Sequence, residues 1–167
     1  DVLAYHFSLA GLAREASVYA ERAGDRAASH STYAEASANY RTAIEENARL
    51  SPGADRDARE LALLLKLGPV VAILFGPNHV EFGSLYRRAR SLAETRDDVD
   101  GLFQATWGLW FHANISRDLE EARQRADELI ALSERSGSDS QSLEALHSRW
   151  ATRLNRGEIA GSLADAE

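Results

Sequence analysis

Apolar residues recur along almost the whole chain with the spacing of an amphipathic helix. In segment 12–31 they fall at i, i+3, i+4, i+7 and i+11, which places them on one helix face. The residues of this stripe are Ala16, Tyr19, Ala20, Ala23 and Ala27. Charged residues such as Arg14 and Glu15 occupy the other faces, and no stretch alternates apolar and polar residues as a half-buried strand would. The pattern predicts an all-α protein.

Turn-forming residues divide this pattern into separate helices. Ser51-Pro52-Gly53 is a break, and Gly76-Pro77 ends the most apolar segment because proline cannot continue a helix. The predicted helices are about 2–10, 12–31, 33–50, 55–75, 79–96, 99–115, 119–135 and 141–156, with another start near 159. We expect Pro69 to kink or split the helix 55–75.

Several helix starts carry residues that cap the free N–H groups of a first turn. The predicted capping pairs are Thr32 with Glu35, Asn78 with Glu81, and Asp118 with Glu121. In such pairs a side-chain oxygen accepts from a backbone N–H three residues later. Asp55 is a further predicted cap, after the break at Ser51-Pro52-Gly53.

The chain contains an internal repeat. A shift of about 40 residues aligns segment 105–126 with segment 145–166. Trp110 then meets Trp150, and Asp118 meets Glu158. Each unit is a helix, a tight turn and a second helix, and one unit cannot bury its apolar face alone. Neighbouring units are therefore expected to stack into a curved solenoid.

These units resemble the tetratricopeptide repeat family. Gly157, Glu158 and Ile159 fit its turn, while Ala122 and Ala126 fit its small-residue positions. Two departures are that the spacing is nearer 40 than the usual value of about 34 residues, and that tryptophan stands where a glycine is usual. The resemblance implies a single helical-repeat domain over residues 1–167, a right-handed α-solenoid of about four helix pairs.

A string of segments resembles a more specific group, the helical-repeat region that follows an ATPase module in bacterial multidomain signalling proteins. The segments are Ala10–Ala27, Tyr33–Glu45, Leu65–Ala72, Leu85–Glu94 and Trp107–Arg135. Many such proteins carry a class III adenylate or guanylate cyclase domain, and others a DNA-binding activator domain. The resemblance implies a cytoplasmic, non-catalytic interaction or regulatory module of an adenylate cyclase-like protein. The absence of an initiator methionine fits this expectation of a fragment of a longer protein.

Charge and composition narrow the range of partners. The formal net charge of −7 argues against a general grip on nucleic acid and against attachment to anionic lipid. There is no cysteine, which excludes disulfides and thiolate chemistry. The apolar run 61–75 is shorter than the stretch of about 20 residues that a membrane helix needs, and it contains Lys66. We therefore expect a buried helix there.

Catalytic and ligand-binding motifs are missing from the sequence. The five histidines do not have metal-ligand spacing, and no glycine-rich phosphate loop or nucleophile elbow occurs. We therefore expect no metal, no cofactor and no enzymatic activity in this segment. Any nucleotide cyclase domain that the resemblance implies would lie elsewhere in the parent protein.

An aromatic stripe is the most informative constellation for binding. Phe103, Trp107, Trp110 and Phe111 share one broad helix face, which is typical of core packing. The repeat register offers a second interpretation, in which some positions of first helices point into a concave groove. The candidate groove residues are Gln104, Trp107, Phe111, Asn114, Glu144 and His147. A tryptophan rimmed by polar groups is typical of a peptide anchor.

Two interaction hypotheses follow from these patterns. In the first, the groove binds a protein or peptide partner, or another domain of the same polypeptide. In the second, the chain is a self-association scaffold that forms a homodimer, because the outer face of a terminal helix lacks its next repeat. The repeat arm of an ATPase-type transcriptional activator is a further alternative.

Overall fold

The computed structural model describes residues 2–166 and confirms the all-α prediction. Within these residues the chain forms nine α-helices and no strand. The helices are α1 Val2–Leu9, α2 Ala13–Ser29, α3 Tyr33–Ala48, α4 Ala54–Phe75, α5 Val80–Arg96, α6 Val99–Ile115, α7 Leu119–Ser136, α8 Asp139–Asn155 and α9 Ile159–Ala166. These bounds agree with the predicted ranges to within about two residues, the usual uncertainty of a helix end.

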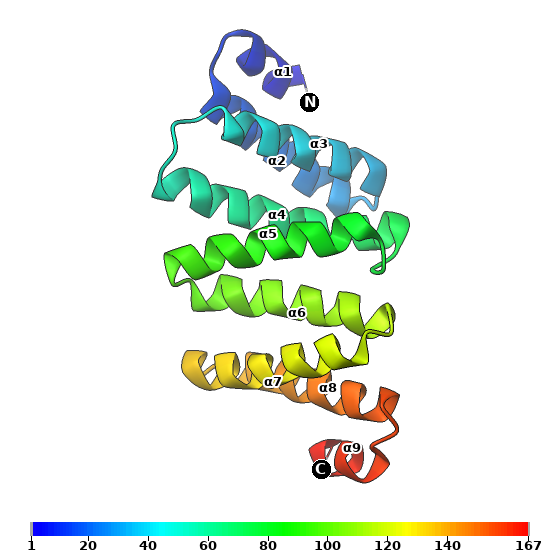
Figure 1. Ribbon diagram of the computed structural model, residues 1–167. Helices are drawn as coiled ribbons and strands as arrows, with labels where there is room; N and C mark the ends of the chain where they lie inside the picture. The colour runs from blue at the N-terminus through cyan, green and yellow to red at the C-terminus, as the bar shows by residue number, and fades with distance from the viewer. Residues whose placement is uncertain (1, 167) are drawn as a thin grey trace.

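The helices form a single stack in chain order. Each packs against the helix before it and the helix after it, and α1 and α9 lie at opposite ends of the stack (Figure 1). Among alternate helices, α6 contacts both α4 and α8. The helices α4, α6 and α8 therefore form one continuous row, which provides a surface shared by three successive helix pairs.

Small residues allow the first helices to approach closely. Four members of the predicted stripe on α2 are buried, and Tyr19 at its edge is half-buried. Ala36 and Ala43 of α3 are fully buried opposite this stripe. Alanine has no rotamers to lose on burial, so these faces pack without a loss of side-chain conformational entropy.

Tyr86 on α5 is wedged between two glycines of neighbouring helices. A Cβ atom added to Gly68 of α4 would lie 2.6 Å from the Tyr86 ring, and one on Gly108 of α6 would overlap it further. A glycine is therefore required on both sides of this ring. Tyr40 makes such a contact on one side, where a Cβ atom added to Gly24 would also lie 2.6 Å from its ring.

Pro69 does not split α4, so this alternative of the prediction is wrong. The helix continues from Ala54 to Phe75 with Pro69 exposed on its surface. Its neighbours Leu67 and Val70 are buried and hold both halves in place. Proline has no N–H, so the carbonyl of Leu65 lacks its usual helical donor.

One predicted cap is confirmed, whereas three others differ. The carboxylate of Asp118 accepts from the N–H of Glu121 at 3.1 Å. Thr32 precedes α3 but forms no capping bond, because its hydroxyl donates to a carbonyl of the preceding turn. At α5 the cap is His79 rather than Asn78, and at α4 it is Gly53 rather than Asp55. The pattern thus located the turns but not always the capping atom.

In the part of the chain that the structure describes, no helix is long and apolar enough to cross a bilayer. The apolar run in α4 is instead packed within the stack. Leu61, Leu64, Leu67 and Val71 of this run all belong to the main buried cluster.

Candidate functional site

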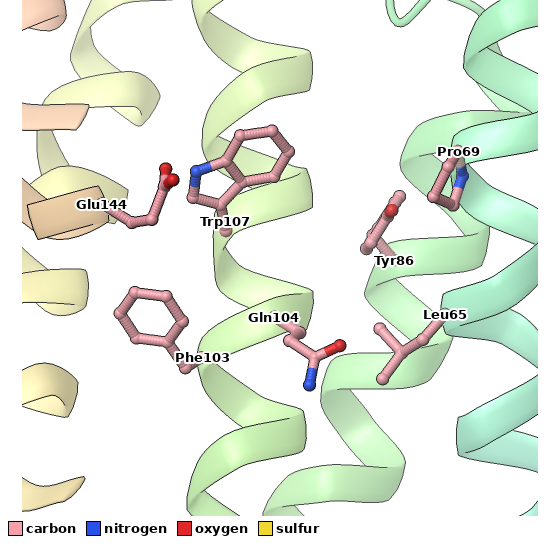
Figure 2. A pocket seen from close by; sticks show the side chains of 7 residues that line it. All are labelled: Leu65, Pro69, Tyr86, Phe103, Gln104, Trp107 and Glu144. Carbon is pink, nitrogen blue, oxygen red and sulfur yellow. The ribbon is translucent and has the colours of Figure 1, made fainter. Parts of the chain in front are cut away.

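A mostly apolar pocket lies on the row of α4, α6 and α8. It is open to solvent and has a volume of about 310 Å³, and Figure 2 shows the seven side chains that line it. They are Leu65 and Pro69 of α4, Tyr86 of α5, Phe103, Gln104 and Trp107 of α6, and Glu144 of α8. We call this the α4–α6 pocket. Its walls come from four helices, so the pocket depends on their stacking and not on a single segment.

Three of the six candidate groove residues line this pocket together. Gln104 and Trp107 lie one turn apart on α6, and Glu144 reaches the same pocket from α8 (Figure 2). Trp107 is half-buried, whereas Gln104 and Glu144 are exposed. The structure therefore brings together residues that are far apart in the sequence and that the repeat register had placed on one surface.

The other three candidates do not line the α4–α6 pocket. Phe111 is half-buried and stacks on Trp107 with 5.4 Å between ring centroids. His147 is exposed beside the ring of Trp150. Asn114 is buried, and its side-chain oxygen accepts from Asn155 at 2.9 Å. Asn114 thus links α6 to α8, a structural role for a residue predicted in the groove.

Some residues of the aromatic stripe on α6 are packed in the core, whereas Trp107 also lines the pocket. Phe103 and Trp110 are about 95% buried, which fits core packing. The indole N–H of Trp110 donates to the hydroxyl of Thr152 at 2.8 Å, which satisfies the one polar atom of that side chain. Trp107 lies between the core and the pocket.

Sequence reasoning missed Leu65, Pro69 and Tyr86 as pocket residues, and it placed Phe103 in the aromatic stripe but not among the groove candidates. Two signals could have found the first three, namely the proline inside an apolar helix and the glycines Gly68 and Gly108. A proline inside a helix removes a backbone donor, and a glycine there marks a close approach. Neither signal gives the position of the partner helix, so the pocket emerges only when α4, α5 and α6 are placed together.

The polar groups of the pocket have no partner within the described part of the chain. Neither the carboxylate of Glu144 nor the hydroxyl of Tyr86 makes a hydrogen bond or an ion pair with a described residue. Burial raises the pKa of Tyr86 to about 12, so its hydroxyl stays protonated at neutral pH. The pocket therefore offers a negative charge and a hydroxyl to a ligand.

Basic side chains near this row are held by acids. The ammonium group of Lys66 contacts Glu21 at 2.7 Å and Asp25 at 2.9 Å. Burial alone would lower the pKa of Lys66, but the hydrogen bonds to Asp25 and Glu21 raise it above its usual value. Arg59 also pairs with Glu21, at 2.8 Å. These bonds connect α2 to α4. Because the two bases are already paired with acids of α2, they do not compensate the charge of Glu144.

The described residues contain no group of three or more His, Asp or Glu side chains that could hold a metal ion. The α4–α6 pocket also has no nucleophile next to a base. Its lining residues are suited to contact and hydrogen bonding rather than to proton transfer.

Comparison with known proteins found no matching family model, no matching curated protein and no matching solved structure. The resemblance to tetratricopeptide repeats and to cyclase-associated repeat regions therefore stays a prediction.

Proposed function

We propose that this chain is a non-catalytic protein-interaction module that binds a segment of a partner in the α4–α6 pocket. The partner is another protein, or another domain of the same polypeptide. One observation carries the proposal: a half-buried tryptophan, Trp107, lines an apolar pocket whose polar groups have no partner among the described residues. Tryptophan is among the residues that most often contribute a large share of the binding energy at protein interfaces, above all when it lies in a pocket.

The architecture proposed for this module is a right-handed solenoid of tetratricopeptide-like repeats. Support comes from the continuous row of α4, α6 and α8 and from the packing of each helix against its neighbours in chain order. A repeat array presents such a row as an extended binding surface. In this interpretation α2–α3, α4–α5, α6–α7 and α8–α9 are the four repeat units.

A regulatory arm of a bacterial signalling protein is the context that we propose for the module. The resemblance of the ordered segments supports an adenylate cyclase-like parent, and an ATPase-type transcriptional activator is the alternative. The full-length gene distinguishes the two. A cyclase domain upstream would support the first, whereas a DNA-binding domain would favour the second.

The binding proposal is tested by selecting peptides from a random display library on the wild-type chain. Selected peptides should lose binding to Trp107→Ala by about tenfold or more, since a central tryptophan contributes about 2 kcal/mol or more at an interface. Trp150→Ala is the matched control, because Trp150 is also half-buried but lies outside the pocket. Equal binding to both variants would contradict the proposal.

Self-association is a second candidate, favoured by exposed apolar side chains at the two ends of the stack. Val2, Tyr5 and Leu9 of α1 are each more than 60% exposed, as is Leu163 of α9. Burial of such a patch against a second copy would be favourable. Sedimentation of the wild type and of Leu9→Glu over a range of concentrations tests it, and a monomer at all concentrations would exclude it.

A further inference from the structure

We infer that the α4–α6 pocket receives a basic side chain, arginine or lysine, of the partner segment. This inference rests on the proposed function and specifies the chemistry of its anchor. Four observations lead to it, namely the exposed part of the Trp107 ring, the unpaired carboxylate of Glu144, the charges on neighbouring helices and the size of the pocket.

The walls of the pocket contain three aromatic rings. Tyr86, Phe103 and Trp107 come from two helices and line the pocket, but the rings of Tyr86 and Phe103 are about 95% buried and both faces of the Tyr86 ring are covered by glycines. Of the three, the half-buried indole of Trp107 is the ring that can offer a face to a ligand (Figure 2). Phe111 stacks on Trp107 at an interplanar angle of 25° and fixes the position of the indole. Aromatic faces attract cations through the ring quadrupole, and tryptophan does so most strongly. The walls thus provide an environment in which a cation is favoured over an anion.

The rim of the pocket also carries one carboxylate that no base of the described chain neutralises. Glu144 carries a negative charge without an ion pair to any described residue. No lysine, arginine or histidine is among the lining residues. A guanidinium or ammonium group would pair with the carboxylate of Glu144, whereas an acidic side chain would be repelled by it.

Charges on the neighbouring elements strengthen this preference. Lys66 and Arg59 on α4 are engaged by Glu21 and Asp25. Arg90 of α5 is bound by Glu128 and Glu94 at 2.6 and 2.9 Å. These bases are therefore already neutralised, and the chain as a whole carries a net charge of −7. Such a surface also attracts a basic segment over a distance.

The pocket has room for one long side chain. Pockets for drug-sized ligands and cofactors enclose about 300–1,000 Å³, so the value of about 310 Å³ lies at the lower limit. The apolar walls of Leu65 and Pro69 would contact the methylene stem of arginine or lysine, while its charged end would lie near Glu144. Both parts of a long basic side chain therefore find a complementary surface.

Three end-blocked peptides with identical leucine-containing flanks and a central arginine, citrulline or norleucine test the inference. Citrulline keeps the shape of arginine without its charge. Binding is followed by the shift of the Trp107 indole N–H in NMR titrations. We expect the arginine peptide to bind about tenfold more tightly than the other two, and this preference to fall as salt increases.

Glu144→Gln supplies a variant that preserves the shape of the pocket. It should reduce the preference for arginine over citrulline to about twofold or less, since the remaining attraction comes from the Trp107 ring alone. Glu134→Gln is the matched control, because Glu134 is an exposed glutamate of α7 outside the pocket. The control should retain the full preference.

The outcomes separate this inference from the function on which it rests. Equal shifts of the Trp107 signal with norleucine and arginine peptides would overturn the basic anchor and leave the binding site intact. Binding that leaves the Trp107 signal unchanged would overturn both. A preference for arginine that survives in Glu144→Gln would also overturn the assigned role of Glu144.

Discussion

Tyr86 has a ring that is held by glycines and a hydroxyl that reaches the pocket. The corresponding hydroxyl of Tyr40 donates to Asp25 at 2.8 Å, whereas that of Tyr86 has no described partner. The two tyrosines share the glycine contact but differ in this bond. Close packing against the glycines explains the position of the Tyr86 ring. The hydroxyl without a partner is explained if it bonds to a ligand.

Gly108→Ala should destabilise the protein by about 1–3 kcal/mol, the usual cost of overpacking a filled core. The added Cβ would overlap the Tyr86 ring, which Gly68 holds from the other side. Urea denaturation measures the change. Gly161→Ala is the control, since its added Cβ would meet only Arg153 at 3.4 Å, an ordinary contact. That variant should be neutral or slightly stabilised by its helix propensity.

Tyr86→Phe should change the stability of the protein at high pH. The pKa of Tyr86 is raised from 10 to about 12 in the folded state, so unfolding releases its proton between these values. Stability is therefore lost as the pH rises from about 10 to 12, by roughly 2–3 kcal/mol from this residue. Over that range the unfolding free energy of the wild type should fall by this amount relative to that of Tyr86→Phe, which has no phenol to ionise. A difference independent of pH would contradict the burial of this phenol.

At the scale of helices, some ion pairs join helices that are not consecutive in the chain. Arg90 of α5 reaches Glu128 of α7 at 2.6 Å and the hydroxyl of Thr106 on α6 at 3.1 Å. This side chain is largely buried and thus connects three helices. Such bonds fix the position of α7 relative to α5, beyond what contact between neighbours provides.

Arg90→Gln should lower stability by about 1–2 kcal/mol, because it leaves the half-buried Glu128 with fewer donors. Arg123→Gln is the matched control, since Arg123 also contacts two acids, Glu120 and Asp127, but all three side chains are over 40% exposed. Its pairs are screened by water, so no measurable change is expected. Thermal unfolding of the two variants gives the comparison, and equal losses would contradict the structural role of Arg90.

The element scale also shows what the sequence could predict. Helical periodicity and turn residues predicted each helix, because both signals are local. The capping atom was predicted at Asp118 but not at Asn78, since a shift of one residue to His79 preserves the turn. For the pocket, the repeat register brought Gln104, Trp107 and Glu144 together. Leu65 and Tyr86 stayed hidden because their contacts depend on how closely three helices approach.

The whole molecule is a linear stack, and this arrangement determines how it should open. Each helix depends mainly on its two neighbours, so stability is expected to vary along the chain as in repeat proteins. Each terminal helix packs mainly against one neighbour, whereas α4, α5 and α6 share the main buried cluster. The α4–α6 pocket therefore lies on the part of the molecule with the largest core.

Hydrogen exchange should reveal this gradient. Amides of α4, α5 and α6 should exchange on the order of 100-fold more slowly than those of α1 and α9, since end helices can open without breaking the central core. Gly108→Ala should lower protection most in α4–α6, because its clash with Tyr86 lies there, and leave α1 nearly unchanged. Uniform protection, or an equal loss in every helix, would instead indicate a single cooperative unit. In that case a partner at the pocket would stabilise both ends of the stack, whereas under the gradient its effect would fade with distance along the helices.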